Sequence, residues 1–250
     1  MTDVGNDRVQ KFELDGSYLT QWPLPVAGPN YYIAVDKDGN TYVTNFNAAQ
    51  VFKFDPSGNL LTQWSTDLGP LGIAIDSVGN VYVVSSVAGQ VEKFDSDGNF
   101  ITQWTVNTTP IGVAVDSADN IYVISRATSN QVQKFTSNGT LITQWSAIGA
   151  GSAFSDIVVD SNGNVYVSDS TNNQIQKFTS GGVLVTQWPT NEYPAGIAVD
   201  SANNVYVACF NSTTKQIQKF TSGGTLITQW GPNGTGSGQF TNAWGIAIGK

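Results

Sequence analysis

The sequence contains no histidine, and its only cysteine and only methionine are Cys209 and Met1. Because histidine is absent, the usual zinc ligand sets and any Ser-His or Cys-His nucleophile pair are excluded. A single cysteine excludes a disulfide within the chain. No stretch approaches the roughly eighteen apolar residues of a membrane-spanning helix, and no segment has the length and period of a helix. These absences favour an all-β protein without the common metal sites.

Charged residues make up only 12% of the chain, with 11 basic and 19 acidic side chains and a net charge of -8. Six of the basic residues are one lysine that recurs along the chain, so no basic stripe can follow a nucleic-acid backbone. We therefore expect neither a nucleic-acid nor a membrane partner. Ser, Thr, Asn, Gln and Gly supply the polarity, which favours an extracellular or cell-surface location, although the first residues do not form a signal peptide.

The tripeptide Thr-Gln-Trp occurs six times at nearly constant spacing. Its tryptophans are Trp22, Trp64, Trp104, Trp145, Trp188 and Trp230. A fixed period of about forty residues indicates a repeat architecture. Residues shared by all copies are expected to be scaffold, so specific chemistry should lie where the copies differ.

Each copy holds four short runs rich in Val, Ile, Tyr, Phe or Trp and separated by turn residues. In the copy that spans Gly196–Trp230 the runs are Gly196–Asp200, Val205–Ala208, Gln216–Phe220 and Leu226–Trp230. Such runs predict β-strands, which we call a, b, c and d. Four antiparallel strands per repeat describe one blade of a β-propeller. We expect small residues of strand a at the axis, and the tryptophan of strand d as a packing residue at the rim.

The shared pattern GIAVDSxGNVYVxDxxNxxVQKFxxxGxxxTQW resembles the NHL repeat. The resemblance covers essentially the whole chain and implies one six-bladed propeller domain over residues 1–250. The blades are expected at about 31–64, 72–104, 112–145, 156–188, 196–230, and 244–250 joined to 1–22. NHL-type propellers include sensor domains of bacterial kinases, RNA-binding domains of tripartite-motif proteins and metal-dependent lyases. The resemblance therefore implies a fold and leaves the function open.

The sixth copy departs from the pattern. Its strand a is followed by Gly249 and Lys250, and the sequence resumes at Met1 without the Asp-Ser-x-Gly-Asn turn or most of strand b. Either the chain is a piece of a longer protein or the sixth blade lacks part of a strand. We expect a ring closed by the two terminal segments, with a defective sixth blade.

The d–a and b–c connections vary between copies and are expected to share one face, where a rigid scaffold carries its specificity. The residue that ends strand b is variable in the same way. It is Asp3, Asn45, Ser85, Ser125, Asp169 and Cys209 in the six blades. These residues are either solvated loop ends or a mixed polar mouth around the channel.

Strand a begins with Gly in four blades and with Tyr32 and Asp156 in the other two. Because these are the first and fourth of six blades, Tyr32 and Asp156 are expected to face each other across the channel mouth. Arg126 lies in the b–c connection of the third blade, beside Asp156. An Arg126–Asp156 ion pair could join two blades, or the pair could bind a small carboxylate or sugar-like ligand. Asp169 and Asn45 complete the candidate ligand-binding set.

Aromatic residues are also concentrated in the variable connections. They are Tyr31, Phe46, Phe154, Tyr193, Phe210 and Trp244. If several are exposed together, they form a partner-binding patch.

Two functions remain. The favoured one is a non-catalytic, monomeric binding propeller that presents its variable face to a protein, peptide or glycan and needs no cofactor. The alternative is a divalent-metal-dependent lyase or lactonase-like enzyme. NHL-type lyases use histidines that are absent here, so such an enzyme would need an oxygen-ligand site, and Asp156, Asp169, Asp3 and Asn45 are its candidates. The segments that begin at Asp36 and Asp95 resemble the start of a calcium loop, but each coincides with a repeated hairpin turn. We therefore predict no metal there and assign no catalytic residues.

Overall fold

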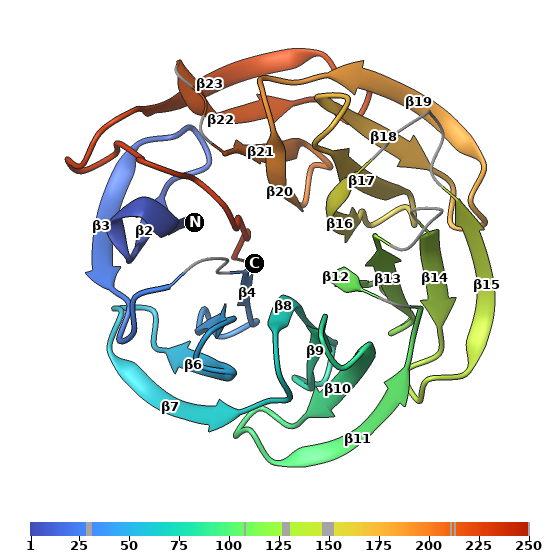
Figure 1. The fold of residues 1–250 in the computed structure, drawn as a ribbon. Coiled ribbons are helices and arrows are strands. Elements are labelled where there is room, and N and C mark those ends of the chain that lie inside the picture. The colour runs from blue at the N-terminus through green and yellow to red at the C-terminus, as the bar shows by residue number, and fades with distance from the viewer. Residues whose placement is uncertain are drawn as a thin grey trace.

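The computed structural model describes residues 1–28, 32–107, 109–126, 131–146, 153–210, 212 and 214–249. Six antiparallel sheets are arranged around a central channel, with the innermost strands near the axis and the Thr-Gln-Trp strands at the rim (Figure 1). The only helix among the described residues is a single 3-10 turn, and none of their helices could span a membrane. The prediction of an all-β, six-bladed propeller is confirmed.

Five blades are complete and follow the chain from the axis outward. The first comprises β4 (Ile33–Val35), β5 (Thr41–Asn45), β6 (Gln50–Phe54) and β7 (Leu60–Ser65). The second comprises β8 (Pro70–Ile75), β9 (Val81–Ser85), β10 (Gln90–Phe94) and β11 (Phe100–Thr105). The third comprises β12 (Pro110–Val115), β13 (Ile121–Ser125), β14 (Gln131–Phe135) and β15 (Leu141–Ser146). The fourth comprises β16 (Phe154–Val159), β17 (Val165–Asp169), β18 (Gln174–Phe178) and β19 (Leu184–Pro189). The fifth comprises β20 (Pro194–Val199), β21 (Val205–Cys209), β22 (Lys215–Phe220) and β23 (Leu226–Pro232).

The sixth blade joins the two terminal segments. It contains β1 (Thr2–Asp3), the 3-10 turn η1 (Val4–Asn6), β2 (Arg8–Phe12) and β3 (Tyr18–Pro23). The segment that follows Asn242 takes the innermost, fourth position. Asp3 forms a β-bridge with Ala243, and the backbone N–H of Thr2 donates to the carbonyl of Gly245 at 2.8 Å. The expected shortening is also present, because β1 has two residues where each other strand b has five.

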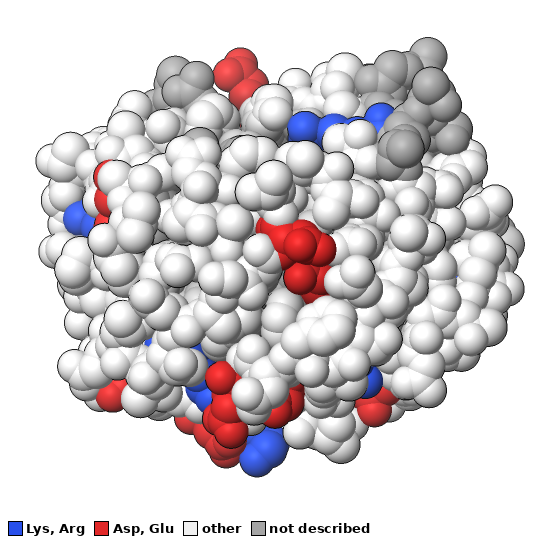
Figure 2. Space-filling view, turned by 60° about the horizontal axis from the view of Figure 1, so that its bottom comes forward, with Lys and Arg blue, Asp and Glu red and all other residues white. Residues whose placement is uncertain are grey.

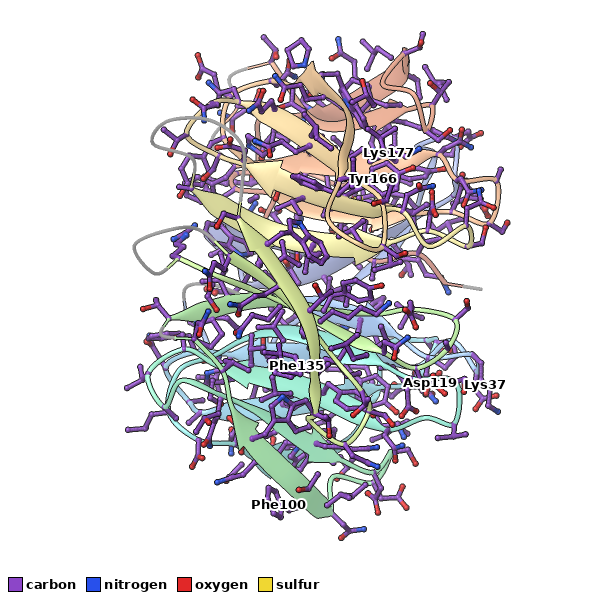
Figure 3. All side chains as sticks on the ribbon, turned by 90° about the vertical axis from the view of Figure 1, so that its right-hand side faces the viewer. Lys37, Phe100, Asp119, Phe135, Tyr166 and Lys177 are labelled. Carbon is purple, nitrogen blue, oxygen red and sulfur yellow. The ribbon has the colours of Figure 1, made fainter. Side chains whose placement is uncertain are left out.

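The turn between strands a and b is built on one aspartate. In the fourth blade, one carboxylate oxygen of Asp160 accepts the backbone N–H of Asn164 at 2.8 Å. The other accepts the Asn164 amide at 2.8 Å and the Tyr166 hydroxyl at 2.9 Å. The ammonium of Lys177 lies 5.0 Å from the centre of the Tyr166 ring and donates to the carbonyl of Ser222 in the next blade at 3.1 Å (Figure 3). The same Lys-over-Tyr arrangement recurs in blades one, two, three and five.

The repeated tryptophans lie between blades. Trp64 packs edge to face with Tyr42 of its own blade and against Phe94 of the next, with ring centres 6.2 and 6.0 Å away. Its indole also covers Gly98, whose φ is +88°, and a Cβ atom there would lie 2.5 Å from the ring. Because all six tryptophans cover a glycine of the next blade in this way, Thr-Gln-Trp is a blade-packing motif.

Candidate functional site

The variable connections meet on one face of the ring. The b–c connections are tied to the d–a connections by backbone hydrogen bonds, for example from Phe210 N–H to the carbonyl of Tyr193 at 2.9 Å. The a–b turns lie on the opposite face, where Lys37 and Asp119 share one side of the molecule (Figure 3). We call the first surface the loop face. On the side drawn in Figure 2, basic side chains are sparse and acidic ones gather in small separate patches.

The central channel is apolar. Its cavity of about 180 Å³ is lined by three or four residues from the innermost strand of each blade, nearly all of them Val, Ile or Ala. The exceptions are Tyr32 and Asp156. Among the described residues that line the channel, Tyr32 therefore supplies the only side-chain hydroxyl and Asp156 the only carboxyl group.

Tyr32 joins blades one and four across the channel mouth. Its side chain is only 4% exposed, and its hydroxyl donates to the carbonyl of Ser155 at 2.9 Å. Its backbone N–H donates to Thr44 Oγ1 at 3.2 Å, which fixes the start of strand a. Burial raises the pKa of Tyr32 above its ordinary value, and the nearby Asp156 adds to this increase. Tyr32 is thus a neutral, hydrogen-bonded ring that narrows the mouth.

Asp156 is a buried carboxyl group that links blades four and five. One oxygen accepts the backbone N–H of Ile157 at 2.9 Å, and the other accepts that of Ile197 in the next blade at 3.1 Å. Burial raises the pKa of Asp156 to about 7, although both backbone hydrogen bonds oppose the increase. A carboxyl group that titrates near neutrality in an apolar channel has the protonation behaviour of a general acid or base.

Arg126 lies beside this pair of blades without an ion pair to Asp156. Its guanidinium donates to Ser155 Oγ at 3.3 Å, one residue from Asp156. None of the ion pairs found in the described ranges joins Arg126 and Asp156. Arg126 is exposed at the edge of the channel mouth.

Asp169 and Asn45 lie apart from the channel. Both are fully buried. Asp169 accepts hydrogen bonds from Asn172 and Gln174 of its own blade at 2.9 and 3.1 Å. Asn45 donates to the carbonyl of Val26 at 3.1 Å. The residues that end strand b therefore organise the adjacent loops, and Asp3 does the same at the seam. In the described part of the chain, no three carboxylate or thiol groups form a cluster able to hold a metal ion.

Four aromatic side chains form a continuous row on the loop face. Tyr193 packs against Phe210 with ring centres 5.6 Å apart, and Phe210 packs edge to face with Trp244 at 5.1 Å. Trp244 in turn lies 6.3 Å from Tyr32. We call Tyr193, Phe210, Trp244 and Tyr32 the aromatic row. Phe46 lies outside it, partly buried against the core, and Tyr31 and the side chain of Phe154 lie outside the described residues.

Two remaining sequence motifs have structural roles. The carboxylate of Asp36 accepts hydrogen bonds from the side chains of Asn40 and Tyr42, and that of Asp95 accepts one from the side chain of Asn99. Both apparent calcium loops are therefore hairpin turns. Cys209 is fully buried, and burial raises the pKa of its thiol to about 12. At neutral pH such a thiol stays protonated and unreactive.

Two buried charged residues were not singled out from the sequence. The carboxyl group of Glu92 accepts hydrogen bonds from the Ser85 hydroxyl at 2.6 Å and from the backbone N–H of Asp67 at 3.1 Å. Burial raises the pKa of Glu92. Arg8 forms an ion pair with Asp3 at 2.9 Å. Each stands where most other copies have glutamine, so the available signal was a charged residue in place of a repeated neutral one.

Comparison with known proteins is informative at the level of family and fold. The sequence model of the NHL repeat matches residues 155–178 and 192–220. No curated protein sequence matches the chain.

Among solved structures, one of a nidogen/laminin complex is similar to this chain with a TM-score of 0.80 and 14% identity, over 98% of this chain and 95% of that one. Virginiamycin B lyase from Staphylococcus aureus has a TM-score of 0.71 and 16% sequence identity, and the match covers 98% of this chain and 83% of that one. A streptogramin B lyase structure has a TM-score of 0.69 and 18% sequence identity, and the match covers 84% of this chain and 72% of that one. At these identities the likeness concerns the fold alone. The two matched repeats and the six-bladed fold together support assignment to the NHL-repeat β-propeller family.

Proposed function

We propose that the chain is a non-catalytic binding propeller that holds a protein, peptide or glycan partner on its loop face. The aromatic row carries this proposal. Its outer member, Tyr193, is 37% exposed, Phe210 and Trp244 are partly exposed, and Tyr32 anchors the inner end. Packed aromatic rings offer a large contact area and lose little side-chain entropy on binding. The row therefore suits the apolar face of a sugar or of a peptide side chain.

The backbone at Tyr193 supports a role in binding. Its φ is +50°, a left-handed conformation that is uncommon for an aromatic residue. The same position before the proline of strand a is also left-handed in two other blades, as Gly69 with φ of +78° and as Thr109 with φ of +60°. Since glycine and threonine satisfy this turn, the fold does not require a tyrosine here. An exposed aromatic residue on a loop that the scaffold does not need is a candidate for function.

Arrays of immobilised glycans and peptides test the proposal directly. We expect the parent chain to bind a defined set of probes, and a Tyr193→Gly, Phe210→Ser variant to bind them at least about tenfold more weakly. The matched control is Phe100→Ser, because Phe100 is 56% exposed but lies on the outer strand β11. The proposal fails if no probe binds, or if Phe100→Ser lowers binding as much as the double variant.

A divalent-metal-dependent lyase or lactonase is the second candidate. Asp156 favours it, since its carboxyl group titrates near neutrality and the similar solved structures include lyases. The other candidate ligands do not lie beside Asp156. They form hydrogen bonds or ion pairs within their own loops, and they are Asp169, Asp3 and Asn45. Turnover of a streptogramin B substrate in Mg²⁺ by the parent chain, lost in Asp156→Asn, would replace the binding proposal with the enzymatic one.

A further inference from the structure

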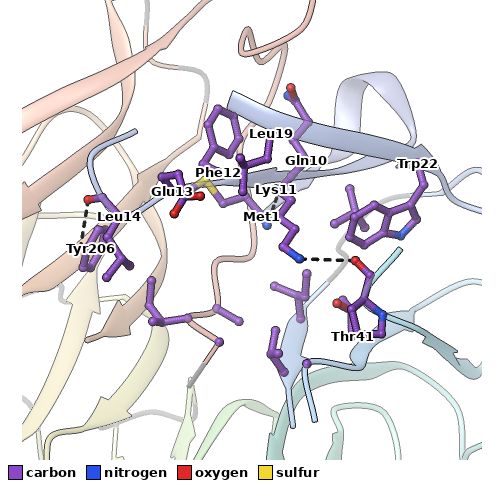
Figure 4. Close-up of a pocket in the computed structure, with 18 residues that line it drawn as sticks. Met1, Gln10, Lys11, Phe12, Glu13, Leu14, Leu19, Trp22, Thr41 and Tyr206 are labelled. Carbon is purple, nitrogen blue, oxygen red and sulfur yellow. Dashed lines mark hydrogen bonds between the residues drawn. The ribbon is translucent and has the colours of Figure 1, made fainter. Parts of the chain in front are cut away.

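A large cavity in the sixth blade belongs to the sheet of that blade. It has a volume of about 430 Å³ and is bordered by Lys11, Phe12 and Trp22 (Figure 4). In the fifth blade, Tyr206 of strand b pairs with Lys219, the counterpart of Lys11. The cavity therefore lies where the second strand of a blade runs. The central channel is different, because it lies outside the sheets and is shared by all six blades.

The channel combines apolar walls with polar groups at one end. Its walls consist of Val, Ile and Ala side chains, for example Val113 and Ala198. Asp156 is near the beginning of β16, and Tyr32 directly precedes β4. Because each innermost strand runs from the loop face toward the a–b turns, the carboxyl group and the hydroxyl both lie at the loop-face end. The channel therefore matches a molecule with one polar head and a short apolar tail.

The Asp156 carboxyl group has hydrogen-bonding capacity left for such a head. Each of its oxygens accepts one backbone N–H, from Ile157 at 2.9 Å and from Ile197 at 3.1 Å. An ionised carboxylate can accept about four hydrogen bonds. Among the described residues, no cationic side chain forms an ion pair with Asp156. A buried charge is stabilised by a partner of opposite sign, so a bound cation would complete this site.

The surroundings favour an organic cation over a metal ion. A divalent ion takes about six oxygen ligands, which the Val, Ile and Ala walls do not offer. Tyr32 lines the channel beside Asp156, and cations are attracted to the face of such a ring. Arg126, the nearby cationic side chain, does not line the channel and donates to Ser155 Oγ. The net charge of -8 also attracts cations to the molecule.

We propose that the channel binds a small organic monocation of the alkylammonium class, with its ammonium group at Asp156 and Tyr32 and its tail along the apolar walls. The channel volume of about 180 Å³ limits the tail to a few carbon atoms. Each added methylene group should strengthen binding about fourfold until the channel is full. This site goes beyond the proposed binding of a partner on the loop face and does not depend on it.

An NMR titration of the full chain with n-butylammonium chloride tests the proposal. At pH 8 the carboxyl group is ionised, since the pKa of Asp156 is about 7. We expect saturable shifts of channel methyl groups, such as those of Val113 and Ala198, with a Kd of at most about 10 mM. Butan-1-ol and butyrate have the same length without the positive charge and should bind at least about tenfold more weakly. Ethylammonium, which lacks two methylene groups, should also lose more than about tenfold.

Two variants locate the site. Asp156→Asn keeps the size of the side chain, removes its charge and should weaken butylammonium binding at least about tenfold. The matched control is Asp97→Asn, which removes the same charge from an exposed c–d turn and should leave binding unchanged. Ala198→Leu should abolish binding, because the larger side chain fills the channel. Urea unfolding shows whether each variant is folded, and if one is not, the ligand series on the parent chain decides the outcome.

Three results would overturn the proposal. The first is the absence of saturable shifts at the channel methyl groups of the parent chain. The second is equal binding of butyrate and butylammonium, which would remove the role of charge. The third is full binding by a folded Asp156→Asn variant. None of these measurements involves the aromatic row, so this proposal and the proposed function can fail separately.

Discussion

At the scale of single residues, Asp156 gives the propeller a distinct pH dependence. Burial raises its pKa in the folded state to about 7, above the ordinary value of 3.8. Between these two values the folded state binds a proton that the unfolded state has lost. The contribution of Asp156 to the free energy of unfolding is therefore largest below about pH 4 and falls as the pH rises toward about 7.

We predict that Asp156→Asn removes this dependence. From pH 5 to pH 8, the parent chain should lose about 2–3 kcal/mol of stability relative to the variant. Urea denaturation of both proteins at several pH values measures the difference, and other titrating groups cancel in the comparison. A difference that stays constant across this range would show that the folded-state pKa of Asp156 is not raised.

The candidate residues show what a repeat sequence can and cannot predict. Tyr32 and Asp156 stood out because they replace a repeated glycine, and the sixfold period placed them on opposite blades. The roles of Asp169 and Asn45 could not be predicted in this way. Each ends a buried strand, and whether its side chain faces the channel or folds over the next loop depends on the loop backbone, which follows no repeat.

At the scale of structural elements, the c–d turn and the tryptophan of the preceding blade form one packing unit. Gly98 and Gly79 are both left-handed, with φ of +88° and +97°. They differ in their surroundings. A Cβ atom at Gly98 would lie 2.5 Å from Trp64, whereas one at Gly79 would meet its nearest neighbour, Ser96, at 4.0 Å.

Alanine substitutions at Gly79 and Gly98 distinguish the cost of backbone strain from the cost of disturbed packing. We predict that Gly79→Ala costs about 1–2 kcal/mol, the strain of a left-handed alanine alone. Gly98→Ala should cost about 2–4 kcal/mol, because its methyl group also displaces the indole of Trp64. Thermal and urea unfolding of the two variants measure both values. Equal losses would mean that the tryptophan moves aside without cost and does not hold the blades together.

Strand positions followed closely from the sequence, since alternating apolar runs and Asp-Asn turns recur in five blades. The sixth blade shows the limit of that approach. A short strand b could be predicted by aligning copies, but the cavity bordered by Lys11 and Trp22 could not. Its walls come from segments that are far apart in the sequence, and packing between such segments follows no local pattern.

At the scale of the whole molecule, a buried polar cluster closes the ring. Arg8 pairs with Asp3 at 2.9 Å and donates to the carbonyls of Thr235, Gly236 and Gln239 at 2.8 to 2.9 Å. The other oxygen of Asp3 accepts the backbone N–H of Thr241 at 3.1 Å. These contacts join the first and last parts of the chain. They involve the d–a connection after β23, whose residues are not repeated in the other blades and so could not be predicted from the repeat.

We predict that Arg8→Met lowers the free energy of unfolding by about 3–5 kcal/mol, because it leaves the buried carboxylate of Asp3 and several carbonyls without their donor. Asp3→Asn added to Arg8→Met should restore part of the loss, since no unpaired charge then remains buried. Lys37→Met is the control and should change stability by less than about 1 kcal/mol, because its ion pair with Asp38 is exposed. Urea unfolding followed by tryptophan fluorescence measures all three. If Arg8→Met were no more harmful than Lys37→Met, closure would depend on the short β1 ladder and the apolar contacts of the sixth blade instead.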